Sequence, residues 1–263
     1  MKQQVAAAPS TDVICLGWRL AVEAGVELLG AGAETARVED TVERIGRAVG
    51  AKKIDAFVTP TGLFAAMEDA DGASFTTVRR IRYIENNIAV ITAINSMSRD
   101  LAEGKSDVFQ AWDKLCAVKR NRLAYTPAVV AIAAGIFSGA FAHLFQGKAL
   151  DMLFALLCGY SLSTSSYFLR RWGVNMFLRS SLGGVIAAIW GLIATTVSAT
   201  CSRDAVILGG LMVLVPGAVI TGAVRDVMSG ELVSGVSRAA EALMVALAIA
   251  VGVAAVFGLG GVV

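Results

Sequence analysis

The spacing of hydrophobic residues changes near residue 122. Before that point, apolar and charged residues alternate over short distances. After it come apolar runs of about 20 residues separated by short polar segments, and a helix of that length can cross the hydrocarbon core of a bilayer. The pattern therefore predicts a soluble domain over residues 1–119 and a membrane-embedded helical bundle over residues 120–263.

The soluble part begins with an amphipathic pattern over residues 13–29. Arg19, Glu23 and Glu27 fall along one helical face, which favours a helix packed on a soluble domain over a membrane span. The Ser-Thr-Asp run at residues 10–12 supplies a start signal for this helix.

A second helix, three strands and two further helices are predicted next. The second helix covers residues 34–49, with Gly50 as its stop. Strand-like runs bounded by turn residues follow at 54–58, 63–67 and 74–78. The Asp-Ala-Asp-Gly run at residues 69–72, between the last two, resembles a hairpin connection. Helical spacing then returns in two apolar faces: Ile84, Ile88, Ile91, Ile94, Met97 and Leu101, followed by Val108, Trp112, Leu115 and Cys116. Helices around a small antiparallel sheet make this an α+β domain.

Five spans are predicted in the second part, at about residues 125–145, 150–169, 181–200, 205–224 and 239–259. Basic residues gather on one side of these spans: Lys119, Arg120, Arg122, Arg170, Arg171, Arg179, Arg225 and Arg238. The other side holds only Lys148 and Arg203. Because cytoplasmic loops carry the excess of positive charge, we expect the N-terminal domain in the cytoplasm and the C-terminus outside.

Composition supports the same class of protein. Hydrophobic residues make up 56% of the chain and charged residues 17%, whereas soluble domains carry about a quarter charged residues. A net charge of +2 without a basic stripe argues against a nucleic-acid partner. The four cysteines have no metal-ligand spacing, so neither a metal nor a cofactor is expected. Residues 1–9 contain no apolar core, so no secretory signal is expected.

Small and hydroxylated residues recur in the predicted spans. Gly135 and Gly139 form a small-xxx-small step, and the Gly183-Gly184 pair offers another surface for close helix packing. The second and third spans are rich in serine and threonine. These hydroxyls either bond to carbonyls of their own helices or line a polar path.

The fourth span contains a helix-breaking pair, Pro216 and Gly217. Proline has no N–H, so the helix loses a hydrogen bond there. An unsatisfied carbonyl in hydrocarbon is costly, and interrupted helices therefore often line a transporter's substrate site. The alternative is a plain kink satisfied by neighbouring helices. In the first interpretation Pro216, Gly217 and Thr221 line a site near the midplane.

Charged residues near the last span include two candidates for proton binding. Asp226 and Glu241 are candidates for carrying a proton, because partial desolvation raises the pKa of a carboxyl group. Arg238 and Glu241 are three residues apart on one face of the last helix, near the interface, so snorkelling or compensation of the helix dipole is the alternative account of Glu241. His143, the sole histidine, is expected at the outer interface.

Polar residues of the N-terminal domain permit two interpretations. The set is Glu34, Arg37, Glu39, Asp40, Thr59 and Thr61. No nucleophile or base is placed near them, so a solvated charged face and an ordinary turn are more probable than a catalytic site. We expect a role in gating or assembly.

Two separated motifs resemble those of the threonine/serine exporters. The first is the run AGAETARVEDT at residues 31–41 followed by FVTPTG at residues 57–62. The second comprises Pro216-Gly217, Arg225-Asp226, Ser229-Gly230, Ser234-Gly235 and Arg238. The resemblance covers nearly the whole chain. It implies a secondary exporter of small metabolites in a bacterial inner membrane.

The resemblance also implies how the membrane spans of the transporter are distributed over one or two chains. In the family's fused form one chain carries about ten spans, and in the split form a chain like this one pairs with a smaller membrane protein. The split form is associated with succinate export, so a threonine/serine or dicarboxylate substrate is expected, with a second subunit or a homo-oligomer as the assembly. Either substrate class carries a carboxylate, so the resemblance implies that Arg225 and Arg238 attract this group by charge-assisted hydrogen bonds. The absence of a P-loop motif favours an ion gradient over ATP. A membrane-tethered hydrolase and a non-transporting regulatory or scaffold subunit are the alternatives.

Overall fold

The computed structural model describes residues 11–82, 84–121 and 125–259. The predicted start signal at Ser10, the stretch 1–9 and Arg122 lie outside this part of the chain. The chain divides into two compact units, each considered by itself. The first unit comprises residues 1–123 and 221–238, and the second comprises residues 124–220 and 239–263.

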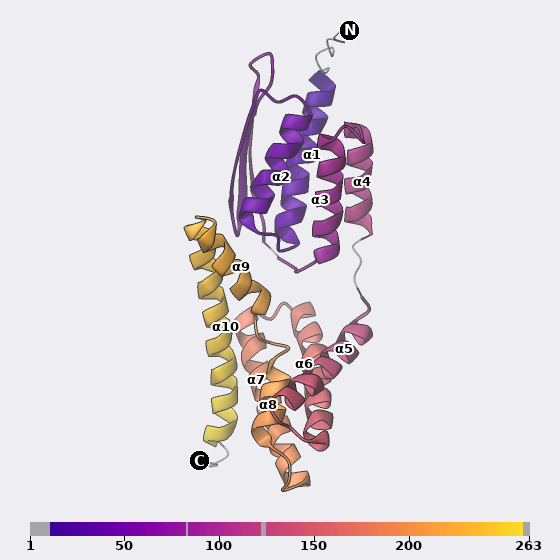
Figure 1. Ribbon diagram of the computed structural model, residues 1–263. Helices are drawn as coiled ribbons and strands as arrows, with labels where there is room; N and C mark the ends of the chain where they lie inside the picture. The colour runs from indigo at the N-terminus through magenta and orange to yellow at the C-terminus, as the bar shows by residue number, and fades with distance from the viewer. Residues whose placement is uncertain (1–10, 83, 122–124, 260–263) are drawn as a thin grey trace. The chain divides into compact units, whose positions relative to one another are not determined.

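The first unit contains a three-stranded antiparallel sheet in the order β1-β2-β3. Two helices, α1 and α2, pack against the sheet, and α3 and α4 cover them on the other side (Figure 1). Leu20, Leu28, Ile45 and Leu63 are fully buried in the core between these layers. The elements are α1 (Thr11–Gly30), α2 (Thr35–Ala48), β1 (Lys53–Thr59), β2 (Gly62–Glu68), β3 (Ser74–Arg80), α3 (Ile88–Ala102) and α4 (Val108–Arg120). The predicted α+β architecture of this part is confirmed.

Turn chemistry fixes the hairpin between β2 and β3. The Asp69 carboxylate accepts hydrogen bonds from the backbone N–H groups of Asp71 and Ala73 at 3.0 and 2.8 Å. Gly72 follows with φ 85°, a conformation that other residues adopt only with strain. The hairpin predicted from this Asp-Ala-Asp-Gly run is therefore confirmed.

The apolar face predicted to begin at Ile84 is wrong in its first turn. Helix α3 begins at Ile88, because the Asn87 side chain accepts a hydrogen bond from the N–H of Val90 at 3.2 Å and caps the helix. Ile84 therefore precedes the helix, and Ile88 is 78% exposed. Burial of this face starts only farther along, at Ile94, Met97 and Leu101.

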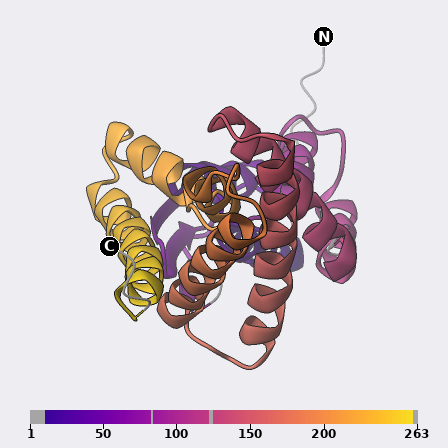
Figure 2. The same ribbon diagram turned by 90° about the horizontal axis from the view of Figure 1, so that it is seen from below.

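Among the described residues of the second unit, helices are the only regular secondary structure. The unit contains α5 (Pro127–Leu144), α6 (Ala149–Arg171), α7 (Met176–Val197), α8 (Arg203–Leu211) and the C-terminal part of α10 (Leu232–Leu259). Helices α5 to α8 lie side by side in Figure 2. Among the described residues, four helices are long and apolar enough to cross a membrane: α5, α6, α7 and α10. The chain is thus a polytopic membrane protein.

Helix α7 differs in position from the third predicted span, residues 181–200. It begins at Met176, where the Asn175 side chain accepts a hydrogen bond from the N–H of Leu178 at 2.9 Å. It ends at Val197, before the predicted limit at Thr200. The Asn175 cap sets the start of α7, and the turn after Val197 sets its end. Hydropathy alone detects neither feature.

Glycines and hydroxyls serve helix packing in this unit. A Cβ atom added at Gly135 or Gly139 of α5 would lie 2.9 Å from the Leu156 carbonyl oxygen or 3.0 Å from that of Met152, both in α6. In the hydroxyl-rich stretches, Ser161, Thr164, Ser165, Thr195 and Thr196 donate to carbonyls of their own helices. These contacts favour the packing interpretation over a polar path.

Candidate functional site

The fourth predicted span, residues 205–224, is not one helix. Helix α8 ends at Leu211, and α9 (Gly217–Met228) begins directly after Pro216. At about 1.5 Å per residue, α8 reaches less than half of a hydrocarbon core about 30 Å thick. It contacts α5, α6 and α7. Pro216 is half-buried, whereas Gly217 and Thr221 are exposed.

The structure brings the two sequence motifs together in the first unit. Arg225 of α9 forms an ion pair with Glu34, the residue that precedes α2. Arg37 Nη2 lies 3.9 Å from Glu34 Oε2 on the same side. The Arg225 side chain is 60% exposed and that of Glu34 is 23% exposed. This outer pair therefore remains in contact with solvent.

A second, buried pair joins α9 to α10. Arg238 Nε lies 3.1 Å from Asp226 Oδ2, with side-chain exposures of 11% and 1%. Arg238 Nη2 also donates a hydrogen bond to the Ala33 carbonyl oxygen at 3.0 Å. Glu241, one turn along α10, is exposed and has no ion pair within the described ranges. Arg238 and Glu241 thus lie in different surroundings, although their spacing predicted a shared face.

Close packing of α9 on α10 places this buried pair. A Cβ atom at Gly222 would come within 2.8 Å of Arg238 Nη1, so the guanidinium passes directly over this glycine. A Cβ atom at Gly235 would lie 3.0 Å from the Ala223 carbonyl oxygen and would overlap the Val227 side chain. The Ser-Gly step at residues 234–235 therefore has a steric function in the second motif.

Thr35, the first residue of α2, is a member of the site that the sequence did not reveal. It is fully buried, and its hydroxyl and N–H interact with the Asp226 carboxyl group. Within the part of the chain that is described, however, neither Thr35 Oγ1 nor Asp226 Oδ2 has a well-aligned hydrogen bond. Glu34 provides no side-chain cap for α2, since it pairs with Arg225. Thr35 belongs to the first motif, but in the sequence it is a hydroxyl residue among charged ones, and no pattern singles it out.

The surroundings of Asp226 change its acidity. Burial raises the pKa of this carboxyl group, and Arg238 opposes the change. The negative charge of Glu34 raises the pKa further, while the hydroxyl and N–H of Thr35 lower it. The net effect is a pKa above the ordinary range for aspartate. Asp226 therefore retains a proton more readily than an exposed aspartate does.

The remaining polar residues of the N-terminal domain contact groups within that domain. Glu39 Oε1 accepts a hydrogen bond from the Val58 N–H at 2.7 Å. Asp40 forms an ion pair with Arg44 on the outer face of α2. The Thr59 hydroxyl donates to the Gly62 carbonyl at 3.4 Å, and the Thr61 carbonyl accepts from the Ile81 N–H. The contacts of this turn satisfy the Thr59 hydroxyl and the Thr61 carbonyl without a ligand.

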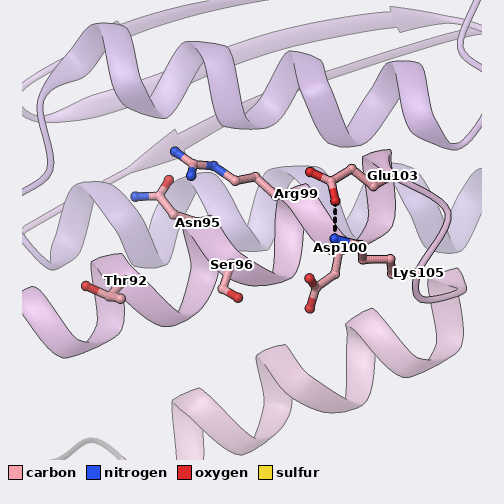
Figure 3. Close-up of a pocket in the computed structure, with 7 residues that line it drawn as sticks. All are labelled: Thr92, Asn95, Ser96, Arg99, Asp100, Glu103 and Lys105. Atoms are coloured by element: carbon pink, nitrogen blue, oxygen red, sulfur yellow. Dashed lines mark ion pairs between the residues drawn. The ribbon is translucent and has the colours of Figure 1, made fainter.

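A polar groove lies on α3, apart from both motifs. Its volume is about 400 Å³, and Figure 3 shows its lining residues: Thr92, Asn95, Ser96, Arg99, Asp100, Glu103 and Lys105. Glu103 pairs with Lys105, and Asp100 pairs with Lys114 at 2.8 Å. Ligand sites are usually concave and largely apolar with a few polar groups, which this open groove is not. We therefore place the candidate site at the motif residues.

Comparison with known proteins gives matches over almost the whole chain. The family ThrE, described as "Putative threonine/serine exporter", matches residues 19–260. The Escherichia coli K12 protein named "Probable succinate transporter subunit YjjP" is 26% identical over 243 residues, which cover 89% of this chain and 91% of that protein. A Klebsiella aerogenes protein of the same name is 24% identical over 89% of this chain and 90% of its own length.

A longer relative occurs in Mycobacterium tuberculosis. This "Probable threonine/serine exporter" is 21% identical over 86% of the present chain, which spans only 43% of that protein's length. No solved structure matches the chain.

Proposed function

The chain belongs to the threonine/serine exporter family, and on this premise we propose that it is a subunit of a secondary-active exporter for small carboxylate-bearing metabolites. Family and relatives identify a transporter and not an enzyme. The substrates named for the relatives are succinate and threonine or serine. These molecules share the carboxylate group, so the proposal names that group as the common feature.

The transport pathway is proposed to include the interrupted helix. Helix α8, the break at residues 212–216 and the start of α9 together form a fifth, discontinuous span, with Pro216, Gly217 and Thr221 near the substrate. Support comes from the short length of α8 and from the general use of broken helices at transporter sites. In this arrangement the N-terminal domain is cytoplasmic, the C-terminus lies outside, and the membrane is the bacterial inner membrane.

A second membrane subunit is proposed to complete the transporter. Two relatives carry the word "subunit" in their names, and the mycobacterial relative is more than twice as long as the region matched here. A smaller multi-span protein supplying an inverted second half fits these facts. A homo-oligomer is the alternative assembly.

The observation that carries the proposal is the contact between the two motifs. Arg225 and Arg238 each form an ion pair with a carboxylate of the chain itself, which supports a role for both guanidinium groups in binding carboxylates. In the proposal they attract the substrate carboxylate, while Asp226 and Glu241 carry protons. The polar residues Glu34, Arg37, Glu39, Asp40, Thr59 and Thr61 act in gating or assembly.

Flux measurements test this function. We expect proteoliposomes containing this chain and a candidate second subunit, a smaller multi-span membrane protein, to transport labelled succinate, threonine or serine under a proton gradient. Arg225→Ala should reduce flux at least tenfold, because the guanidinium can no longer hold the substrate, whereas Arg225→Lys should retain part of it. Arg99→Ala, an exposed arginine of α3, is the matched control and should transport normally.

Two outcomes would contradict the proposal. Normal flux through Arg225→Ala would remove this arginine from the mechanism. A complete absence of flux for small carboxylates with both chains present would defeat the export function and favour a regulatory or scaffold subunit.

A further inference from the structure

The start of α2 and Arg238 surround a position suited to a carboxylate. We propose that Thr35, the first-turn N–H groups of α2 and Arg238 bind the carboxylate of the exported substrate, and that Asp226 fills this site as an internal competitor until it is protonated. The inference rests on the proposed function, because the substrate class comes from there. It adds a binding site to the N-terminal domain and a reason for proton coupling.

The donors at this position match the ligand. A guanidinium, a hydroxyl and the free N–H groups of a helix N-terminus are the groups that bind carboxylates in proteins. Helix α2 is 14 residues long, and its own N-cap residue, Glu34, leaves the first turn without a side-chain cap. Thr35 is fully buried, and its hydroxyl and N–H interact with the Asp226 carboxyl group. The Thr35 Oγ1 atom nevertheless lacks the alignment of a full hydrogen bond, so a better-placed carboxylate could complete this contact.

The Asp226 carboxylate lies at this position, but its hydrogen bonding there is incomplete. Its Oδ2 lies at ion-pair distance from Arg238 Nε but lacks the alignment of a hydrogen bond, and no other described residue satisfies that oxygen. A buried oxygen left unsatisfied weakens the hold of the site on this side chain. A free carboxylate is not tied to α9, so it can align with the same donors better than Asp226 can.

In this proposal, the protonation state of Asp226 determines whether its own carboxyl group or the substrate carboxylate occupies the site. The charged groups facing Asp226 are Arg238 from α10 and Glu34 from the start of α2, and Arg225, its neighbour in α9, pairs with Glu34. When Asp226 accepts a proton, Arg238 becomes a buried cation without a counter-ion, which is unfavourable. A substrate carboxylate then restores the pair. Proton binding and substrate binding therefore favour each other.

Access to the site is proposed from the Arg225 side. Arg225 is 60% exposed, whereas the Arg238 side chain is 11% exposed, so a carboxylate arriving from water meets Arg225 before Arg238. The two arginines thus act in succession, which explains why both belong to one motif.

Equilibrium binding to the purified full chain in detergent tests the site. The probes are radiolabelled succinate and L-threonine, with L-threoninol, which lacks the carboxylate, as the control ligand. Asp226→Asn preserves shape and removes the charge, so it should bind both carboxylates at least tenfold more tightly at pH 7. Wild-type affinity should rise as the pH falls, whereas affinity of Asp226→Asn should stay constant.

The role of Thr35 is measured in the same assay. In the Asp226→Asn background, Thr35→Val should weaken binding about tenfold, and Thr35→Ser, which keeps the hydroxyl, should not. Binding by Asp226→Asn that is no tighter than wild type would overturn the proposal. If this variant does not fold, the wild-type pH dependence decides, and an affinity that does not increase at lower pH would overturn it equally.

These results separate the site from the transport function. Binding requires neither a second subunit nor a gradient. Flux with unchanged binding in Asp226→Asn would leave the exporter in place and reject the site. Tighter binding in Asp226→Asn without flux in any reconstitution would establish the site and reject export.

Discussion

Arg238 illustrates how a single charged residue is accommodated beside a long apolar segment. It lies in α10, which contains a window apolar enough to cross a membrane. Burying a guanidinium is costly unless a counter-ion and hydrogen bonds compensate, and Asp226 and the Ala33 carbonyl supply them. The same compensation makes Arg238 dependent on the charge of Asp226. A change in the protonation of Asp226 therefore alters the contact between α9 and α10.

Glu39 provides a residue-scale test in the same domain. Burial raises the pKa of this half-buried carboxyl group, the Val58 N–H opposes the change, and nearby Glu231 and Glu43 add to it. A raised pKa in the folded state means that folding favours the proton, so this contribution to stability declines as the pH rises above the ordinary glutamate range. Glu39→Gln keeps an acceptor for Val58 and cannot ionise.

We expect Glu39→Gln to be more stable than wild type at pH 7, by at most about 1 kcal/mol because solvent screens part of the effect. The gain should vanish near pH 4, where the wild-type carboxyl group is protonated. Thermal unfolding between pH 4 and pH 8 measures this difference, with the exposed Asp40→Asn as control. Lower stability of Glu39→Gln at every pH would mean that the carboxylate itself holds β1 to α2.

At the scale of elements, glycines decide how closely helices of the second unit approach. A Cβ atom at Gly184 of α7 would overlap the Ile249 carbonyl oxygen of α10, and one at Gly252 of α10 would overlap that of Ser181. The obstructing atoms belong to backbone, which cannot move aside as a flexible side chain does. The two helices therefore depend on these glycines for their contact.

Gly252→Ala tests this packing. We expect a loss of about 1–3 kcal/mol in unfolding free energy, since the added methyl group forces α7 and α10 apart. Gly258→Ala is the matched control in the same helix, because a Cβ atom there meets no atom within 4 Å. Thermal unfolding in detergent, followed by tryptophan fluorescence, compares the two variants. Equal stability would show that the helices separate at no cost.

For the whole molecule, the charge distribution predicts a single orientation in the membrane. Two native cysteines report on it, because Cys15 lies in α1 and Cys201 lies between α7 and α8. With the N-terminal domain in the cytoplasm, the connection between α7 and α8 lies outside. Cys15 is exposed and Cys201 is partly exposed, whereas Cys158 is buried.

Labelling of single-cysteine variants tests this orientation. In intact cells, a membrane-impermeant maleimide should react with Cys201 and not with Cys15. After permeabilisation Cys15 should react as well, and the buried Cys158 should remain protected as an internal control. Reaction of Cys15 before Cys201 in intact cells would reverse the proposed topology.

Most elements of this chain could be read from local sequence. The hairpin at Asp69–Gly72 and the stop at Gly50 depend on the conformations of a few adjacent residues, and Gly50 indeed adopts φ 93°. The membrane character depends on apolar runs, which hydropathy detects without a structure. Local signals failed in two places. The apolar periodicity predicted too early a start for α3, because the Asn87 cap sets the first residue of that helix. Hydropathy also predicted one continuous span over residues 205–224, whereas the length of the break before Pro216 depends on packing around α8.

Local sequence patterns were enough to identify a membrane protein with an α+β domain, and the two motifs indicated the family. They also singled out Arg225, Asp226, Arg238 and Glu34 as candidates. How these groups pair, and that Thr35 lies with them, became clear from the folded chain alone. Arg225 and Glu34 are 191 positions apart, and charge pairing over such a separation depends on folded geometry that no local periodicity records.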